Sequence, residues 1–384
     1  MFQLELTPGK YYYQASSLKE FSVKNRRRFV VLGGAGTIGK IVVRDLFETH
    51  PDNQILIADY NGPAARMLAE SFKDARVEAK FADARQPKEL VRLLNGRCVA
   101  INCLQHNFNL CVMEAAHRAG VHYVDLGGLF SWTRKQLRLD KKFRSAELTA
   151  VIGMGCAPGI TNVLAAYAAS QLDKVRSIKI RVGSMDFNEP SSKIWFPYSA
   201  QTIIEELTLK PWIFRGGKFR QIPPRTGWEC TELPEPVGKV WTLWTRHSEV
   251  ATLPLSFRTK GLKYCDFKVS FDREFVDEVM KRFNSGWTLQ QFKNLPTPEY
   301  NPHDYEISRV IVDAITVDCH AKAKPEWQAN AGDMDTACPP SIVAQMIADG
   351  LIDRHGVLPP EVAVPIQPFF TELEKRGLKI TLRH

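Results

Sequence analysis

The sequence predicts an α/β protein in which an N-terminal doubly wound parallel sheet is combined with an inserted α+β domain that contains a mixed sheet. Three observations predict this fold class. Short apolar runs alternate with helical patterns from residue 28 to residue 172, a glycine-rich turn follows the first run, and hairpin signals and longer alternating runs follow after residue 172. Strands that alternate with helices at short spacing are typical of a parallel sheet covered by helices on both faces.

The elements of the parallel sheet are predicted in chain order. Its strands are six short apolar runs, at 29–32, 54–58, 77–81, 98–103, 121–126 and 150–154. The helices show apolar residues at helical spacing or open on a proline, at 38–47, 64–72, from 87 onward, 110–119, 132–147 and 160–172. Residues 148–172 contain no charge and are long enough to span a bilayer, but the glycines and proline in their first half favour a strand, a tight loop and a helix.

The second half of the chain predicts the mixed sheet. Strands are expected at 176–182, 264–271 and 306–319, a hairpin around 215–218, and helices at 199–209, at 273–283 and from Pro339-Pro340 to Asp349. We therefore expect an N-terminal extension at 1–27, a parallel-sheet domain at 28–128 that is completed by 339–384, and a mixed-sheet domain at 129–338.

Composition and charge exclude several classes of protein. Hydrophobic residues make up 44% and charged residues 24%, as in ordinary globular proteins. Six Lys or Arg and two Glu in residues 1–28 supply +4 of the net charge of +9, and the other charges are interspersed, so no nucleic acid or membrane partner is expected.

The eight cysteines form no CxxC and there is no apolar leader, so we expect a cytoplasmic protein. The histidines form no HxxxH or HExxH pair, so no metal is expected.

The turn after the first strand carries the most specific motif. Gly34, Gly36 and Gly39 have the spacing GxGxxG between a strand and a helix. The first glycine permits the tight turn, the second lets the backbone approach a pyrophosphate, and the third lets the helix pack close to the sheet. Thr37 and Ile38, at the start of the helix, offer N–H groups to the phosphates. The motif predicts a Rossmann domain that binds a dinucleotide.

Asp59 bears on the identity of this dinucleotide. It follows Gly39 by 20 residues, at the end of the next strand, where a carboxylate receives the adenosine ribose hydroxyls. Because a carboxylate there repels a 2′-phosphate, we expect NAD. NADP stays open, since Arg66 and Arg85 are near in sequence.

Polar residues at the carboxyl ends of two further strands are candidates for binding and catalysis. Asn102 could bond the nicotinamide ribose or form a turn. Asp125 could orient or deprotonate an amino substrate or cap a turn, and His122 and His106 are either bases or packed histidines. Gly159 lies in a glycine-bounded loop whose N–H groups could hold a substrate carboxylate. Cys156 in this loop lacks an evident His or Asn partner, so we do not expect a nucleophile.

These residues together resemble the saccharopine dehydrogenase-like family, in particular its lysine 6-dehydrogenases. The resemblance covers about 28–384 and rests on the glycine motif, Asn102 with 108–109, 122–128, 157–159, 252–257 and short matches in 344–361. It implies a Rossmann domain rejoined by C-terminal helices, a mixed α/β domain between them, hydride transfer at a C–N bond next to an amino acid side chain, and a homodimer.

Residues 247–253 depart from the lysine 6-dehydrogenase pattern. Glu249 in this segment could pair with a substrate ammonium or be a solvated loop acid, which leaves lysine open as the substrate. We expect an NAD(P)-dependent amino acid dehydrogenase in which Asp125, His106 or His122 is the base. Two alternatives stay open: an enzyme that reduces an imine made from an amine and an aldehyde, and a non-catalytic NAD-binding regulatory protein.

Overall fold

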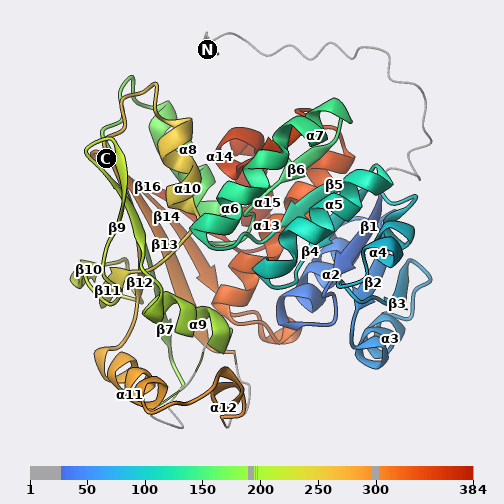
Figure 1. The fold of residues 1–384 in the computed structure, drawn as a ribbon, viewed down its shortest axis with the longest axis horizontal. Helices are drawn as coiled ribbons and strands as arrows, with labels where there is room; N and C mark the ends of the chain where they lie inside the picture. The colour runs from blue at the N-terminus through green and yellow to red at the C-terminus, as the bar shows by residue number, and fades with distance from the viewer. Residues whose placement is uncertain (1–26, 189–193, 195, 197, 296–301, 384) are drawn as a thin grey trace.

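The computed structural model describes residues 27–188, 194, 196, 198–295 and 302–383, so the predicted N-terminal extension lies outside the described residues except for Arg27. Two sheets form the framework (Figure 1). The first has seven parallel strands in the order β15-β6-β5-β4-β1-β2-β3, and the second has nine strands. The predicted fold class is confirmed.

The parallel sheet is buried on both faces, which explains the continuous apolar runs of its strands. In β1, Phe29 and Val31 face one hydrophobic cluster, whereas Val30 and Leu32 face another on the opposite side. Its strands are β1 (Arg28–Leu32), β2 (Gln54–Asp59), β3 (Val77–Phe81), β4 (Val99–Asn102), β5 (His122–Asp125), β6 (Thr149–Val151) and β15 (Gly356–Leu358). The helices of this half are α2 (Thr37–Thr49), α3 (Gly62–Ser71), α4 (Pro87–Leu94), α5 (Asn109–Ala119), α6 (Phe130–Gln136), α7 (Asp140–Ser145) and α8 (Ile160–Ser170), with a 3-10 turn η1 (His106–Phe108).

The second sheet is mixed, because β12 runs parallel to β7 while its other pairs are antiparallel. Its strands are β7 (Ser177–Asp186), β8 (Trp212–Arg215), β9 (Lys218–Gln221), β10 (Glu229–Glu232), β11 (Lys239–Trp244), β12 (Tyr264–Ser270), β13 (Asp304–Val312), β14 (Ile315–Lys322) and β16 (Lys379–Arg383). The helices between them are α9 (Ala200–Thr208), α10 (Glu249–Ser256), α11 (Arg273–Asn284) and α12 (Leu289–Lys293).

Three predicted elements were wrong. The helix expected at 132–147 is divided into α6, a 3-10 turn (Leu137–Leu139) and α7. The run 306–319 is a hairpin of β13 and β14 rather than one strand, because Asp313 takes a positive φ of 52° at the turn. The helix expected from Pro339 is α13 (Ala331–Ala348), which already begins at the cap Asn330. Asn330 accepts the backbone N–H of Asp333, and this capping box starts the helix, so the two prolines lie in its interior.

The C-terminal segment ties the two sheets together. After α13, which lies between them (Figure 1), β15 pairs with β6 in the first sheet and β16 pairs with β14 in the second. The helices α14 (Pro360–Ala363) and α15 (Ile366–Lys375) connect these strands. The strand β6, beyond the predicted boundary at residue 128, therefore belongs to the first sheet, and β16, beyond the predicted boundary at residue 339, belongs to the second.

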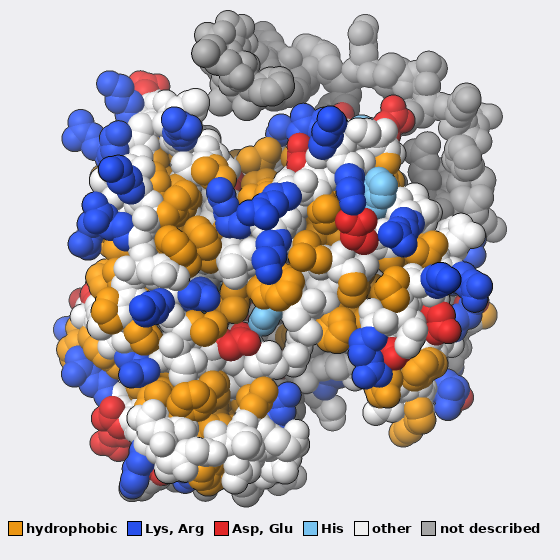
Figure 2. Space-filling view, viewed as in Figure 1, with side chains coloured by type: hydrophobic (Ala, Val, Ile, Leu, Met, Phe, Trp, Pro, Cys, Tyr) orange, Lys and Arg blue, Asp and Glu red, His pale blue; other side chains and the backbone are white. Residues whose placement is uncertain are grey.

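The distribution of surface charge and the apolarity of the helices bear on the expectation of no nucleic acid or membrane partner. Lys and Arg side chains are spread over the face seen in Figure 2 rather than gathered in one patch. Among the helices that the structure describes, none combines the length and apolarity needed to cross a membrane. The uncharged run 148–172 forms β6, a tight loop and α8, as predicted.

Candidate active site

The glycine-rich turn lies at the carboxyl edge of the parallel sheet, between β1 and α2. A Cβ on Gly34 would lie 2.8 Å from a backbone carbonyl oxygen, and one on Gly39 would lie 2.1 Å from another, so neither position has room for a side chain. A Cβ on Gly36 would meet only one protein atom within 4 Å. No side chain caps α2, whose first residues are Thr37 and Ile38. The turn therefore fits the pyrophosphate of a dinucleotide at the start of this helix.

Asp59 is fixed beside this turn at the end of β2. Its Oδ2 accepts the backbone N–H of Ala35 at 3.0 Å, and its Oδ1 accepts that of Asn61 at 2.8 Å. Arg85 stacks over the exposed ring of Tyr60, with the guanidinium carbon 5.1 Å from the ring centre. The carboxylate predicted to meet the ribose and a cation that could meet a phosphate therefore lie at the same end of the sheet.

Asp125 is fully buried and does not line the cavity described below, contrary to its predicted contact with the substrate. Its Oδ1 accepts the backbone N–H groups of Gly127, at 2.8 Å, and Gly153, at 2.7 Å. Its Oδ2 accepts the hydroxyl of Tyr123 and the amide of Gln136. Burial raises the pKa of Asp125, although these four hydrogen bonds oppose the shift. The carboxylate therefore holds two loops of the cavity wall in place.

Asn102 belongs to the same network and is also fully buried. Its amide donates to Asn109 and to the hydroxyl of Tyr123, both at 3.0 Å, and its oxygen accepts the backbone N–H of Leu104. Asn102 thus shapes the turn after β4, and its predicted direct contact with the nicotinamide ribose is not supported by this placement.

The structure separates the two candidate histidines. His122 accepts the backbone N–H of Thr149 at 3.0 Å, and burial lowers the pKa of His122 to about 4. It lies outside the cavity and is a packed histidine rather than a base. His106 lines the cavity from η1, with its Nδ1 3.9 Å from a carboxylate oxygen of Glu205 on α9. A catalytic role for His106 stays a prediction.

The backbone N–H groups from Gly159 into the start of α8 already have partners within the chain, so they are not available to a substrate carboxylate. The N–H of Gly159 donates to the side chain of Asn162, and those of Ile160 and Thr161 donate to carbonyl oxygens of the loop itself. Gly159 takes a φ of +131°, and a Cβ there would lie 2.0 Å from the oxygen of Gly155. Its role is to close the loop tightly, which presents Cys156 to the cavity.

A cavity of about 1520 Å³ lies between the glycine-rich edge of the first sheet and the second sheet. Among the described residues, ten acidic side chains line it, against three Lys or Arg and two His. The acidic residues are Asp186, Glu205, Glu206, Asp272, Glu274, Asp277, Glu278, Asp304, Glu306 and Asp333. The cavity wall therefore favours a cationic ligand.

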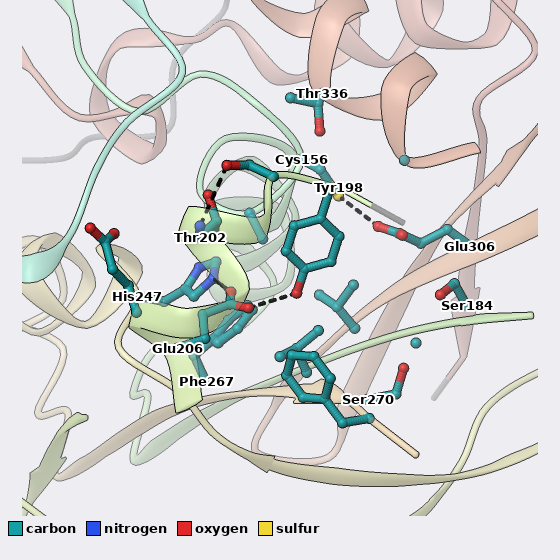
Figure 3. A pocket seen from close by; sticks show the side chains of 18 of the residues that line it. Cys156, Ser184, Tyr198, Thr202, Glu206, His247, Phe267, Ser270, Glu306 and Thr336 are labelled. Atoms are coloured by element: carbon teal, nitrogen blue, oxygen red, sulfur yellow. Dashed lines mark hydrogen bonds and ion pairs between the residues drawn. The ribbon is translucent and has the colours of Figure 1, made fainter. Parts of the chain in front are cut away.

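His247, which the sequence analysis did not single out, faces this cavity between two carboxylates (Figure 3). Its Nε2 lies 3.0 Å from Glu206 and its Nδ1 lies 3.3 Å from Glu249. The ring stacks on Phe267 with 3.7 Å between ring centres. Burial alone would lower the pKa of His247, but the charges and hydrogen bonds of the two glutamates raise this pKa to about 9.

Glu206 connects His247 to the cavity, whereas Glu249 does not reach it. Glu206 also accepts the hydroxyl of Tyr198 at 2.6 Å, and both residues line the cavity. Glu249 is fully buried behind His247 and accepts the hydroxyl of Thr161, so its predicted direct contact with the substrate is not supported by this placement. The departure from the family pattern at 247–253 was the one signal in the sequence that pointed to this cluster.

Comparisons with known proteins agree with this architecture. The model of the saccharopine dehydrogenase NADP binding domain matches residues 29–151, and that of the saccharopine dehydrogenase C-terminal domain matches 155–378. The structure of saccharopine dehydrogenase (L-Glu forming) from Saccharomyces cerevisiae superposes with a TM-score of 0.70 at 15% identity, over 93% of this chain and 100% of that one.

Two curated relatives share part of the sequence. Carboxyaminopropylagmatine dehydrogenase of Synechocystis sp. is 25% identical over 264 residues, and carboxynorspermidine synthase of Vibrio cholerae is 24% identical over 275 residues. Each match covers 65% of this chain, and the chain spans 64% of the length of each relative. The two matching domain models together cover most of the chain, and they identify the parallel-sheet half as an NAD(P)-binding domain. By these matches, which confirm the resemblance noted in the sequence, the chain belongs to the saccharopine dehydrogenase family.

Proposed function

We propose that this protein is an NAD(P)-dependent oxidoreductase that forms a C–N bond of an amine with more than one positive charge, by reducing an imine made from that amine and an aldehyde. The observation that carries the proposal is the excess of acidic side chains around a cavity that borders the dinucleotide turn. A ligand with several ammonium groups balances such a wall, whereas a ligand with carboxylates alone would be repelled.

The names of the two curated relatives support this substrate class. Both names denote carboxylated derivatives of aminopropyl compounds, which carry several amino groups. The expected lysine 6-dehydrogenase activity belongs to the same reaction type, because it also changes the oxidation state of a carbon next to nitrogen. Lysine has one side-chain ammonium, so it makes less use of the acidic wall.

A proton must reach the nitrogen as the imine is reduced. When the dinucleotide is bound, its nicotinamide supplies the hydride that turns the C=N bond into a C–N bond. The nitrogen then takes one proton, and we assign its supply to His247, which is protonated at neutral pH because its pKa is raised to about 9. Glu206 accepts the His247 N–H and lines the cavity, so its carboxyl group can carry this proton to the substrate.

The same groups disfavour amine oxidation at neutral pH. An oxidative reaction needs a proton acceptor, and His247 accepts a proton only above the pH at which it becomes neutral. Oxidation in the lysine 6-dehydrogenase direction is therefore the second candidate, and we expect it to require alkaline pH. His106 is the alternative proton-transfer group, since it also faces the cavity.

The test is to follow NADH and NADPH consumption with a panel of amines, each given with and without an aldehyde. We expect consumption that needs both partners and that is fastest with diamines and polyamines. Reduction of NAD by lysine alone would favour the second candidate. Dinucleotide binding without turnover of any pair would identify a regulatory protein and contradict the proposal. His247→Gln is expected to lower turnover, and Glu374→Gln on exposed α15 is a matched surface control.

A further inference from the structure

Two acids and a thiol that the proposed proton transfer does not use lie together at one end of the cavity. Cys156 and Glu306 line the cavity, whereas the buried Asp335 lies next to them and is not part of the cavity wall. The Cys156 thiol and carboxylate oxygens of Glu306 and Asp335 lie within 4.8 Å of one another. In Figure 3, Cys156 and Glu306 lie next to each other, on the side of the cavity opposite His247. We call these three residues the acidic recess.

The recess carries negative charge that no neighbour balances. Of the acids beside it, Asp304 accepts the backbone N–H of Ala331 at 2.9 Å and Asp333 accepts that of Asn330 at 3.1 Å, so both use the N-terminus of α13. Among the described residues, no Lys, Arg or His forms an ion pair with Glu306 or Asp335.

Asp335 supplies an independent sign of a missing ligand. Its side chain is 1% exposed and interacts with Glu306 and Cys156, but its Oδ1 has no hydrogen-bond partner within the described part of the chain. A buried carboxylate oxygen without a partner is costly, so such atoms in folded proteins commonly meet a ligand. The neighbouring Cys156 Sγ is already within 3.0 Å of the Ser308 hydroxyl and within 3.6 Å of Glu306.

We propose that the acidic recess binds the terminal ammonium group of the amine substrate. This inference rests on the proposed function, since it takes the ligand to be an amine. An ammonium group offers three N–H donors, and Glu306 at the cavity wall can accept hydrogen bonds from it, while the Asp335 carboxyl group next to Glu306 adds negative charge. A divalent metal fits less well, because burial raises the pKa of the Cys156 thiol well above its usual range and the described residues supply three ligands rather than four.

Binding of a cation there should release a proton. Burial raises the pKa of Glu306 to about 7 and raises that of Asp335, and the two carboxyl groups interact. The groups that face this pair are Asp304, Asp333, Cys156, Cys319 and Tyr198, none of which is cationic. Near neutral pH the pair therefore retains a proton, and an arriving ammonium favours the doubly ionised form.

The experiment is isothermal titration calorimetry of the full chain with putrescine and with butylamine, which has the same carbon chain and one amino group. We expect putrescine to bind more tightly, by about tenfold to a hundredfold as for a paired buried charge. Titration in phosphate and in Tris, whose ionisation enthalpies differ, should show proton release with putrescine. Glu306→Gln should abolish both the preference and the proton release, whereas Glu374→Gln should change neither.

A second variant guards against misfolding of Glu306→Gln. A Cβ on Gly332, in the first turn of α13, would lie 3.3 Å from Glu306 Oε2, and alanine favours a helix. Gly332→Ala should therefore fold and should weaken the binding of putrescine more than that of butylamine. Thermal unfolding of each variant shows whether it is folded.

Three results would overturn the inference. Equal affinity for the two amines would do so, and so would a preference that survives both variants in folded protein. Tight binding of Zn²⁺ alone that Glu306→Gln removes would reassign the recess to a metal. Putrescine binding without turnover would contradict the proposed function and leave the recess standing, whereas normal turnover by both variants would contradict the recess alone.

Discussion

His247 is held as a cation by two buried carboxylates, Glu206 and Glu249, one at each ring nitrogen. This arrangement leaves a net negative charge on the three groups, which suits a site that both attracts ammonium groups and supplies a proton. It also ties catalysis to pH, because the charge of the cluster changes when His247 loses its proton.

The expected pH dependence follows from the sign of this shift. Because the pKa of His247 is raised to about 9, kcat/KM for imine reduction should fall as the pH rises through this value. The stabilisation of the folded protein by the charged His247 should be fully present below about 6.5 and be lost through the same alkaline range. Steady-state kinetics across pH tests this, and His247→Gln should remove the alkaline limb and lower kcat/KM by about 10²- to 10⁴-fold. A wild-type pH profile in that variant would transfer the role to His106.

Asp59 provides a prediction at the cofactor end. Its carboxylate, fixed by the N–H groups of Ala35 and Asn61, should repel a 2′-phosphate, so we expect a preference for NADH over NADPH. Asp59→Ser should bring the kcat/KM value for NADPH closer to that for NADH. A wild-type enzyme that prefers NADPH would contradict the prediction and would implicate Arg85, which lies over Tyr60 at this end of the sheet.

At the scale of elements, the loops of the cavity wall depend on Asp125. Its carboxylate accepts the backbone N–H groups of Gly127, in the loop between β5 and α6, and of Gly153, in the loop between β6 and α8. Asp125→Ala should leave both N–H groups without partners and destabilise the protein by about 2–4 kcal/mol. Urea unfolding measures this change, with Asp277→Asn on exposed α11 as a control of equal charge. A loss below about 0.5 kcal/mol would contradict the role given to Asp125.

The elements that the sequence predicted correctly are those with a strong local signal. The run Phe29–Leu32 followed by three spaced glycines predicted a strand, a turn and a helix, because each glycine meets a steric demand of its own. The start of α13 was missed because two prolines suggested a helix beginning, whereas Asn330 and Asp333 cap it nine residues earlier. The capping residues indicated a helix start at Asn330, whereas the prolines indicated one at Pro339. Packing of α13 against α2 favoured the longer helix.

At the scale of the molecule, the sequence predicted the fold class and the family but not the cavity. His247, Glu306 and Asp335 lie far apart in the chain, on or next to elements of the second half that carry no recognised motif. Their proximity depends on how the two sheets face each other, which no local pattern encodes. The predicted acids Asp125 and Glu249 are fully buried, and neither lines the cavity. The homodimer and the cytoplasmic location stay predictions.

The acidic wall as a whole predicts a dependence on ionic strength. Salt screens the attraction between the wall and a dication more than that for a monocation. Raising the salt concentration should therefore lower kcat/KM for a diamine more than for the matching monoamine, with the dinucleotide saturating in both. Parallel salt dependence for the two amines would show that the wall does not act on the substrate charge.

The pairing of β15 with β6 has a consequence for biosynthesis. The strand β6 is synthesised early, but its partner β15 is synthesised only after strands β7 to β14 of the second sheet. Until then the nascent chain exposes an apolar strand edge of the kind that recruits other strands. The first sheet is therefore completed only near the end of synthesis, and premature termination before Gly356 would leave a product that lacks the strand next to β6.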